Sequence, residues 1–321
     1  MLIKKGGSRM IISASRRTDI PSYYSDWFFN RIKEGYAYVR NPMNFHQIGK
    51  VTLSPNIVDG IVFWTKNPLP MINRLDELSD YIYYFQFTLN AYGKDVEPNI
   101  PSKNNILIPA FQELSQKAGK DKVIWRYDPI LFNDYYTAEY HLKYFKILVD
   151  KLAEYTEKCT VSFLDLYKNT QKSTASLKLK NPTFQQKEEL MQQFSEIAGD
   201  AGIYIDTCAE DIDVSKFGIR HAHCIDKARF ERLGNCKLIV EKDKNQRPEC
   251  GCVASIDIGA YSTCKNGCLY CYANFSQNTV SKNYSLHDPH SPLLFGNITD
   301  IDVIKVRDVE SYKDCQMNFF E

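Results

Sequence analysis

The chain lacks any apolar stretch that approaches the roughly 20 residues needed to cross a bilayer. It also lacks an excess of charge of one sign, because 40 Lys and Arg stand against 39 Asp and Glu. This balance argues against a broadly basic surface that wraps nucleic acid, although a local basic pocket is compatible with it. The first ten residues contain no apolar segment of the kind found in a secretion signal. We therefore expect a cytoplasmic protein without a membrane partner, in which residues 1–9 are a leader or extension before the fold.

What the chain does have is enough apolar sequence for a core, with 44% hydrophobic and 25% charged residues in a length of 321. It also has ten cysteines. Half of them are scattered, and the other half lie within 22 positions: Cys250, Cys252, Cys264, Cys268 and Cys271. Clustered thiols in a long chain without a secretion signal indicate metal binding rather than disulfides.

Short apolar runs alternate with amphipathic segments along most of the chain. Such continuous runs are typical of parallel strands buried on both faces. Helices are expected at Ser22–Glu34, Thr137–Glu154 and Thr183–Ala198. The expected strands are Met10–Ser15, Tyr36–Arg40, Ile61–Thr65, Ile82–Thr88, Lys122–Tyr127, Thr160–Leu166, Gly202–Asp206 and Ala254–Ala260.

Seven or eight strand–helix units predict an α/β fold, a parallel (β/α) barrel of the TIM type. An open, doubly wound sheet is the alternative. Tyr36–Arg40 could instead pair with a small strand at Val51–Leu53. We expect the barrel to span residues 10–245, a Cys-rich segment at 246–276 to complete it, and an irregular tail at 277–321.

The most specific motif is the run from Cys264 to Cys271, with the spacing C-x3-C-x2-C. Three thiolates in one loop suit three irons of a [4Fe–4S] cluster and leave the fourth open for a small molecule. Gly267 allows the loop to turn tightly. Structural Zn²⁺ held by any four of the five clustered thiols is the main alternative, and a disulfide is a further one.

With Tyr270 before its last cysteine, this loop resembles that of the radical S-adenosylmethionine superfamily, in the form found in its spore-photoproduct-lyase branch. The resemblance implies that Cys264, Cys268 and Cys271 bind the cluster and that the open iron chelates S-adenosylmethionine. It further implies an electron donor and a deoxyadenosyl radical that abstracts a substrate hydrogen.

The position of the loop differs from that superfamily, in which the cluster loop follows the first strand. Here it follows the last, so the resemblance implies a circularly permuted barrel in which the first and last strands are neighbours. The sequence has no Gly-Gly-Glu segment after the next strand in that order, and Ser15–Asp19 occupies this place instead.

The whole chain, over roughly residues 10–295, also resembles a bacterial family of uncharacterised function. The resemblance rests on the segments Ser15–Pro21, Phe63–Pro68 and Trp125–Pro129 together with the C-terminal cysteines. It implies membership of a family but no activity.

Four other cysteines suggest a second cluster: Cys208, Cys224, Cys250 and Cys252. The first two follow predicted strand ends on the same side of the barrel as the cysteine loop, so a four-thiolate site is feasible. Alternatively, Cys208 is simply buried and Cys224 lies at a helix start.

Polar residues occur where the predicted strands end, which is where chemistry gathers in parallel barrels. Arginine and lysine there suit an anionic group, and the carboxylates suit hydroxyl or ammonium groups or proton transfer. Internal salt bridges such as Arg16–Asp19 or Arg126–Asp128 are the alternative. The candidate site residues are Arg16, Arg17, Asp19, Lys66, Arg126, Asp128, Asp165 and Glu210.

These observations favour an iron–sulfur enzyme that resembles radical S-adenosylmethionine proteins and acts on a small anionic or nucleotide-like substrate. The alternative is a non-catalytic barrel, stabilised by zinc or a closed cluster, that binds a phosphorylated ligand. Nucleic-acid repair is a third reading, which the neutral net charge disfavours.

Overall fold

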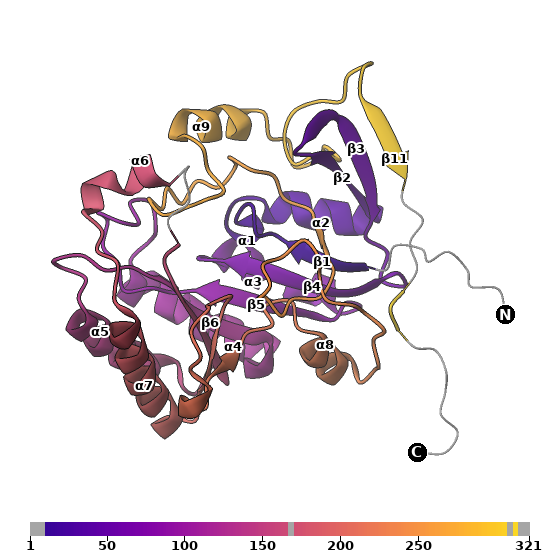
Figure 1. Cartoon of the computed structure of the whole chain (residues 1–321). Coiled ribbons are helices and arrows are strands. Elements are labelled where there is room, and N and C mark those ends of the chain that lie inside the picture. Colours follow the sequence, from indigo (N-terminus) through magenta and orange to yellow (C-terminus); the bar gives the residue numbers. More distant parts are fainter. Residues whose placement is uncertain (1–9, 166–169, 307–310, 314–321) are drawn as a thin grey trace, which may run out of the picture.

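The computed structural model describes residues 10–165, 170–306 and 311–313, and its centre is an eight-stranded sheet in which all strands run parallel (Figure 1). The strands lie in the order β10-β1-β4-β5-β6-β7-β8-β9. Their bounds are β1 (Met10–Ala14), β4 (Val58–Thr65), β5 (Tyr83–Thr88), β6 (Val123–Ile130), β7 (Lys158–Phe163), β8 (Tyr204–Thr207), β9 (Arg220–His221) and β10 (Ile256–Asp257). The prediction of a parallel α/β sheet is confirmed.

The finer prediction of a closed barrel is not shown. Within the described residues, β9 and β10 form the two edges of the sheet, and no pairing joins them. β10 does pair in parallel with β1, at Ile12↔Ile256 and Ser13↔Asp257. The last strand of the sheet therefore lies beside the first, as the circular permutation requires.

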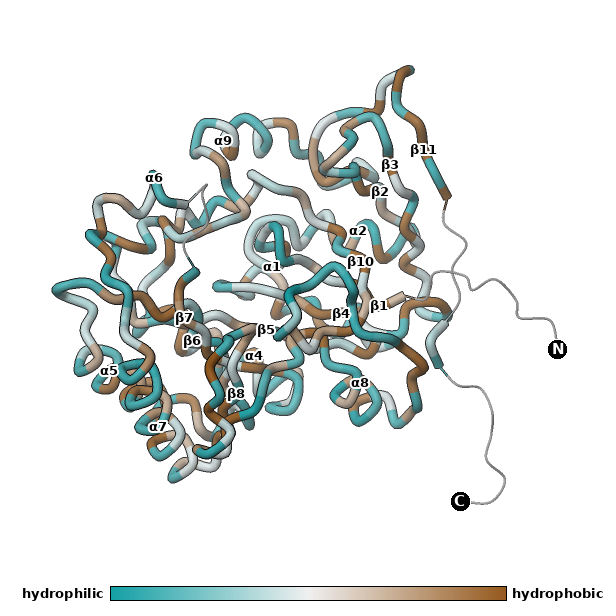
Figure 2. The backbone as a smooth tube through the Cα atoms, in the orientation of Figure 1, coloured by the Kyte–Doolittle hydropathy of each residue, from teal (hydrophilic) through white to brown (hydrophobic). Residues whose placement is uncertain are grey.

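Nine α-helices are described. None of them is long and apolar enough to span a bilayer. In Figure 2, hydrophobic and hydrophilic residues alternate along the turns of α5 and α7, as in helices with one buried side. The bounds are α1 (Ile20–Tyr23), α2 (Ser25–Glu34), α3 (Leu69–Ile72), α4 (Ile108–Ala118), α5 (Ala138–Leu152), α6 (Gln171–Thr174), α7 (Phe184–Asp200), α8 (Lys227–Gly234) and α9 (Gln277–Ser285).

Successive side chains of the strands point to opposite faces of the sheet, and each face has its own core. On the helical face, aromatic residues of the strands pack against α2, α4, α5 and α7; Phe28 contacts Phe63, and Trp125 stacks on Phe145. The other face, which we call the α8 face, carries Ile11, Val62, Tyr84 and Ile124 against Phe230 of α8. Polar strand-end residues continue this second face toward the carboxyl ends.

The second predicted strand is wrong as a member of the main sheet. β2 (Tyr36–Asn41) pairs antiparallel with β3 (Asn44–Thr52), with Ala37 opposite Val51, close to the alternative pairing proposed from the sequence. β11 (Val303–Val306) adds to β3 to complete a three-stranded sheet. The physical reason is that most of β2 is only half-buried, whereas a central parallel strand is covered on both faces.

The segment expected to be an irregular tail contains regular structure. It holds α9, which begins where the Ser276 side chain accepts a hydrogen bond from the Thr279 amide, and β11. The chain between them packs on α2, where the Trp27 indole N–H donates to the carbonyl oxygens of Ser291 and Leu293. Residues 1–9, expected to be a leader, lie outside the described residues.

Candidate functional site

A cavity of about 650 Å³ opens at the carboxyl ends of the strands, and we call it the central cavity. Its wall combines strand-end residues with seven cysteines. Every site residue proposed from the sequence lines it except Glu210, namely Arg16, Arg17, Asp19, Lys66, Arg126, Asp128, Asp165, Tyr270, Cys208, Cys224, Cys250, Cys252, Cys264, Cys268 and Cys271. Arg16 and Cys271, which are 255 positions apart in the sequence, thus meet in one space.

The C-x3-C-x2-C loop enters this cavity because β10 runs parallel to β1. Both strands end on the same side of the sheet, so the loop after Asp257 lies next to the Ser15–Asp19 segment after β1. Asp257 joins the two strand ends: it accepts hydrogen bonds from the Ser13 and Ser15 hydroxyls and from the Arg16 amide, at 2.9, 2.5 and 2.8 Å. The geometry of β1 and β10 therefore fixes where the cysteine loop begins.

Asn266, inside the cysteine loop, anchors it to α1. Its side-chain amide donates to Asp19 at 3.1 Å, and its carbonyl oxygen accepts from the Tyr23 hydroxyl at 2.7 Å. The next residue, Gly267, has φ +70, and a Cβ there would lie 2.8 Å from the Asn99 side chain. The loop needs glycine at this turn for both reasons.

Asp19 has a structural role at these strand ends, because its carboxylate is occupied by hydrogen bonds within the protein. It caps α1 by accepting from the Ser22 amide, and it also accepts from the Thr65 hydroxyl and the Lys66 amide, each at 2.8 Å. With the bond from Asn266, its carboxylate oxygens are saturated. Burial raises its pKa, and these donors oppose the rise. The sequence prediction placed Asp19 at the site but not in this role.

The three thiols of the loop share one environment. Cys264 is buried, and Cys268 and Cys271 are half-buried on the cavity wall. Burial raises the pKa of all three, in the case of Cys268 to about 12, and the nearby ammonium of Lys66 opposes the rise there. A bound metal would remove their protons, as it does for thiol ligands generally.

The donor set of this loop fits an iron–sulfur cluster. Three free cysteine thiols in one loop, spaced C-x3-C-x2-C, are the ligand type of such a cluster, in which each sulfur binds a different iron. Within the described residues, no three His, Cys, Asp or Glu side chains stand in position to hold a single ion as they are.

Tyr270, the aromatic residue of the motif, belongs to a buried charged network. Its hydroxyl donates to Glu97. Glu97 is 1% exposed and also accepts from the ammonium groups of Lys66 at 2.7 Å and Lys103 at 2.5 Å. Burial alone would raise the pKa of Glu97, but the two lysines lower it to about 2. The Lys66 ammonium is therefore paired with Glu97, and its positive charge also acts on the thiol of Cys268.

The two arginines after β1 differ in their partners. Arg17 lies 4.0 Å from Asp257 and over the Tyr261 ring. Arg16 donates to the Ser255 hydroxyl at 3.4 Å, and in the described part of the chain no carboxylate lies within ion-pair distance of its guanidinium. The Arg16–Asp19 pair considered from the sequence does not form. Arg16 is thus available for an anionic group in the cavity.

Arg126 and Asp128, at the end of β6, form the salt bridge considered as an alternative. The Arg126 Nε donates to Asp128 at 3.0 Å, and its Nη1 donates to the Cys224 sulfur, also at 3.0 Å. Arg126 is 4% exposed, so its charge is shared between a carboxylate and a thiol rather than directed to solvent. Asp128 also accepts from the Ser162 hydroxyl.

The four remaining cavity cysteines lie together. The sulfurs of Cys208 and Cys224 are 3.3 Å apart, and the Cys252 sulfur accepts from the amide of Ile225, next to Cys224, at 3.4 Å. The structure thus brings the residues proposed for a second cluster together in the lining of the central cavity. Cys159, by contrast, is buried in the hydrophobic core of the helical face and does not line the central cavity.

Comparison with known proteins identifies the family. The model of a domain of unknown function, DUF1848, matches residues 11–273. The chain belongs to this family. The resemblance to an uncharacterised bacterial family is therefore confirmed, and the DUF1848 match includes both cysteine groups. Among curated proteins, none matches the chain.

One similar solved structure is the carboxyl transferase domain of Rhizobium etli pyruvate carboxylase with pyruvate. This DUF1848 chain is 12% identical to it, with a TM-score of 0.27, over 68% of this chain and 40% of that one. The DUF1848 chain thus spans less than half of that chain. A similarity at this level supports no statement about the site.

Glu210 and Asp165 of this DUF1848 protein lie at the margin of the site. Glu210 is outside the central cavity lining; it accepts from the Phe163 amide at 2.7 Å and lies 3.9 Å from Lys187. Burial raises the pKa of Glu210 to about 7. Asp165 is exposed and pairs with Arg247. Neither carboxylate is placed against the thiols.

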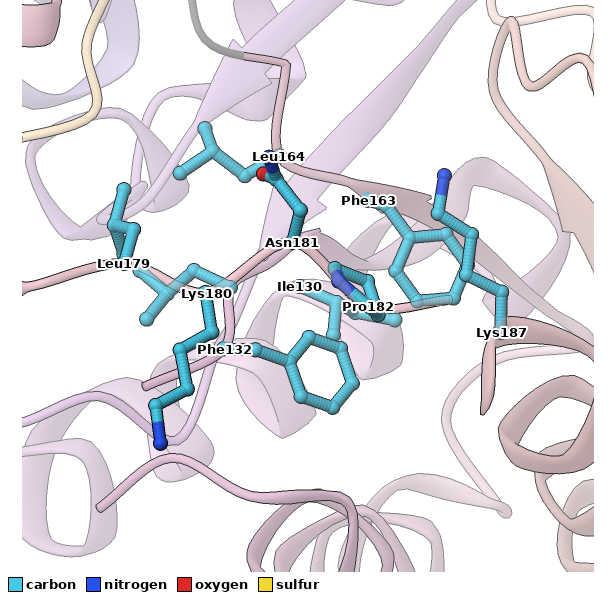
Figure 3. Close-up of a pocket in the computed structure, with 10 residues that line it drawn as sticks. Ile130, Phe132, Phe163, Leu164, Leu179, Lys180, Asn181, Pro182 and Lys187 are labelled. Carbon is cyan, nitrogen blue, oxygen red and sulfur yellow. The ribbon is translucent and has the colours of Figure 1, made fainter. Parts of the chain in front are cut away.

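A smaller cavity of about 150 Å³ adjoins the central one, because Phe163 and Leu164 line both. Figure 3 shows its mixed lining, with the Phe132 and Phe163 rings, the Asn181 amide, and the Lys180 and Lys187 side chains. It offers apolar and cationic groups next to the central cavity.

Three residues of the site escaped the sequence analysis: Glu97, Asp257 and Asn266. Asp257 lies inside the predicted strand Ala254–Ala260, whereas β10 ends at Asp257, so the strand end was predicted three residues too late to mark this residue. Asn266 lies inside the cysteine motif, but the motif itself predicted roles only for the cysteines, Gly267 and Tyr270. Glu97 lies in the loop before α4, and no pattern in the sequence marks it.

Proposed function

We propose that this chain is an iron–sulfur enzyme in which Cys264, Cys268 and Cys271 hold a [4Fe–4S] cluster that binds S-adenosylmethionine at its open iron. When bound, such a cluster supplies one electron to the sulfonium and so starts radical chemistry on a substrate. An electron donor is a necessary partner. The substrate we propose is a small anionic or nucleotide-like molecule, held in the central cavity.

One observation carries this proposal: the three cysteines of the motif line the same cavity as the polar ends of β1, β4, β6 and β7. A loop of three thiols that served only to stabilise the fold would not need a wall of cationic and carboxylate groups opposite it. The cavity, at about 650 Å³, is also within the size range of small-molecule sites.

The residues around the cavity have separable tasks in this proposal. Arg16 would bind a carboxylate or phosphate, since its guanidinium has no acidic partner among the described residues. Trp64 lines the cavity, and its indole N–H has no hydrogen-bond partner in the described structure, so it can donate to a ligand. The Glu97 network would keep Lys66 protonated beside the cluster.

The position of the cysteine loop supports the same proposal. In the superfamily that the motif resembles, the cluster loop and the following strand end lie side by side, and here β10 and β1 provide that pair. In that superfamily a Gly-Gly-Glu segment at this place usually binds the methionyl amino group. The segment after β1 has no such sequence; its Arg16 amide donates to Asp257 of β10, and Asp19 accepts from Asn266 of the loop. In this proposal the Arg16 guanidinium instead binds the carboxylate of S-adenosylmethionine.

The experiment is anaerobic reconstitution with iron and sulfide, followed by EPR of the reduced protein with and without S-adenosylmethionine. We expect a cluster signal that changes when the cofactor is added and that is absent from a Cys268→Ser variant. Cys236→Ser is the matched control, because Cys236 is also half-buried but lies outside the cavity. A signal that the cofactor leaves unchanged would contradict the enzyme proposal. Zinc without iron at this loop would favour a binding protein for a phosphorylated ligand instead.

A further inference from the structure

The second cysteine group lies where the main sheet stays open. Cys208 directly follows β8, Cys224 lies three residues after β9, and Cys250 and Cys252 precede β10. β9 and β10 are the two unpaired edges in the described sheet. The backbone supports the same junction, because the Val253 amide donates to the Ile225 carbonyl at 3.1 Å. The four thiols therefore connect elements from both edges.

From this arrangement we infer that Cys208, Cys224, Cys250 and Cys252 form a metal centre of their own, which holds a single four-coordinate ion of the Zn²⁺ class. The ion would join the β8–β9 edge to the segment that leads into β10. This inference is independent of the proposed function, because it concerns different ligands and a different metal.

One distance between two of these sulfurs favours a single ion over a second cluster. The Cys208 and Cys224 sulfurs are 3.3 Å apart. Two sulfurs on the same tetrahedral zinc, with Zn–S bonds of about 2.3 Å, stand about 3.8 Å apart. Sulfurs on different irons of a cluster stand further apart than this pair.

The surroundings of Cys224 are those of a positioned thiolate ligand. Tyr84 and Gln86 of β5 both donate to its backbone carbonyl, at 2.8 and 2.9 Å. Arg126 donates to its sulfur at 3.0 Å. Such outer contacts orient metal ligands and stabilise the anionic form of the thiol.

The other thiols have similar support. The Ile225 amide donates to the Cys252 sulfur at 3.4 Å. This bond places the Cys252 sulfur beside the backbone that follows Cys224. Cys208 and Cys250 line the central cavity together with them.

Binding would require a small rearrangement. As they stand, no three His, Cys, Asp or Glu side chains of the described residues are gathered about one point. Cys208 and Cys250 both lie in connections between strands rather than inside strands. They are the residues that would move toward Cys224 and Cys252.

The test uses the full chain, purified with zinc, and measures zinc and iron per chain by mass spectrometry of the elements. We expect about one zinc in the wild type, and less than a tenth of that in a Cys208→Ser/Cys250→Ser double variant. The Cys236→Ser control should keep its zinc. A Cys264→Ser/Cys268→Ser/Cys271→Ser variant should keep zinc while it loses iron, which separates this inference from the proposed function.

A second measurement does not depend on variants that fold. Native wild-type protein is alkylated with and without added Zn²⁺, and the modified cysteines are mapped; zinc should protect these four thiols and not Cys236. Absorption of a Co²⁺-substituted sample should show tetrahedral thiolate bands. Eight irons with no zinc, zinc retained by the double variant, or a Cys208–Cys224 disulfide in freshly prepared protein would each overturn the inference.

Discussion

Glu97 is the residue on which the charges around the cysteine loop depend. Its buried carboxylate is shared by Lys66, Lys103 and the Tyr270 hydroxyl, so one acidic group pairs with two ammonium groups and orients the aromatic ring of the motif. A buried charge without its partner costs far more than the pair contributes. Removal of Glu97 would therefore leave Lys66 and Lys103 as two positive charges without their acidic partner.

Replacing Glu97 with Gln should lower the free energy of unfolding by about 3–5 kcal/mol, because Lys66 and Lys103 would keep buried charges without a counter-charge. Urea denaturation followed by circular dichroism measures this. Glu113→Gln is the control, since Glu113 pairs with Lys117 at the surface, and its loss should cost less than about 1 kcal/mol. Equal effects of the two variants would contradict the role given to the network.

Glu210 makes a different prediction, which concerns pH. Burial raises its folded-state pKa from 4.5 to about 7, so the folded protein binds this proton more tightly than the unfolded chain does. Stability from this group is therefore greatest at low pH and is lost as the pH rises from about 4.5 to about 7, by at most about 3 kcal/mol.

A Glu210→Gln variant should not show this loss. The difference in free energy of unfolding between the variant and the wild type should grow in favour of the variant as the pH increases through that window. Urea titrations at several pH values measure it. A difference that stays constant between pH 5 and pH 8 would show that Glu210 titrates normally in the folded protein.

At the scale of elements, side chains in and beside α1 attach the cysteine loop to the strand ends. Asn266 links it to Asp19 and Tyr23, and the Tyr24 hydroxyl donates to the Thr263 carbonyl at 2.7 Å. Since Asp19 also binds the Lys66 amide, one carboxylate joins the ends of β1 and β4 to the loop. The loop is thus positioned before any cofactor binds.

Asn266→Ala should cost roughly 1–3 kcal/mol of stability, because the Tyr23 hydroxyl loses its acceptor and Asp19 loses one of its four donors. In reconstituted protein it should also speed the loss of iron to a chelator. Asn99→Ala is the matched control, since exposed Asn99 also bonds the loop, through the Lys265 carbonyl. If the Asn99 variant loses iron as fast as the Asn266 variant, the anchoring role of Asn266 is wrong.

The docking of α8 on the sheet positions the second cysteine group, because Cys224 lies just before that helix. Phe230 of α8 packs against Gly60 of β4, where a Cβ would lie 2.1 Å from the ring. Gly60→Ala should therefore displace α8 and destabilise the protein by roughly 1–3 kcal/mol. Gly199→Ala, on the open side of α7, meets nothing within 4 Å and should be neutral or slightly stabilising. Thermal unfolding of both variants tests this difference.

At the scale of the whole molecule, the sequence allows the parallel sheet to be predicted because its strands are covered on both faces. Runs such as Ile61–Thr65 and Lys122–Tyr127 correspond to β4 and β6. Tyr36–Arg40 was misassigned because it is equally rich in aromatic and β-branched residues, and its half-exposed hairpin depends on β11, some 260 residues later in the chain. Closure of the barrel could not be judged from strand count alone.

The candidate site, like the fold, could be predicted only in part from the sequence. Cysteines and strand-end charges are visible in the sequence because their residue types and positions follow known rules. The contacts that orient these groups are not visible in the sequence. Asp257 bonds residues some 240 positions away, and Glu97 bonds partners from three separate segments of the chain. Local patterns therefore predicted which groups face the cavity, and only the fold determined which of them are already engaged with one another.

The central claim is that three sulfurs of one loop hold an iron–sulfur cluster that faces the cavity with an open corner. A crystal structure of the reconstituted protein, with anomalous diffraction recorded on both sides of the iron absorption edge, tests it most directly. We predict an iron peak bonded to Cys264, Cys268 and Cys271, with one iron free of protein ligands and directed toward Arg16. Iron bound by four protein ligands, or no iron at these sulfurs, would contradict the account.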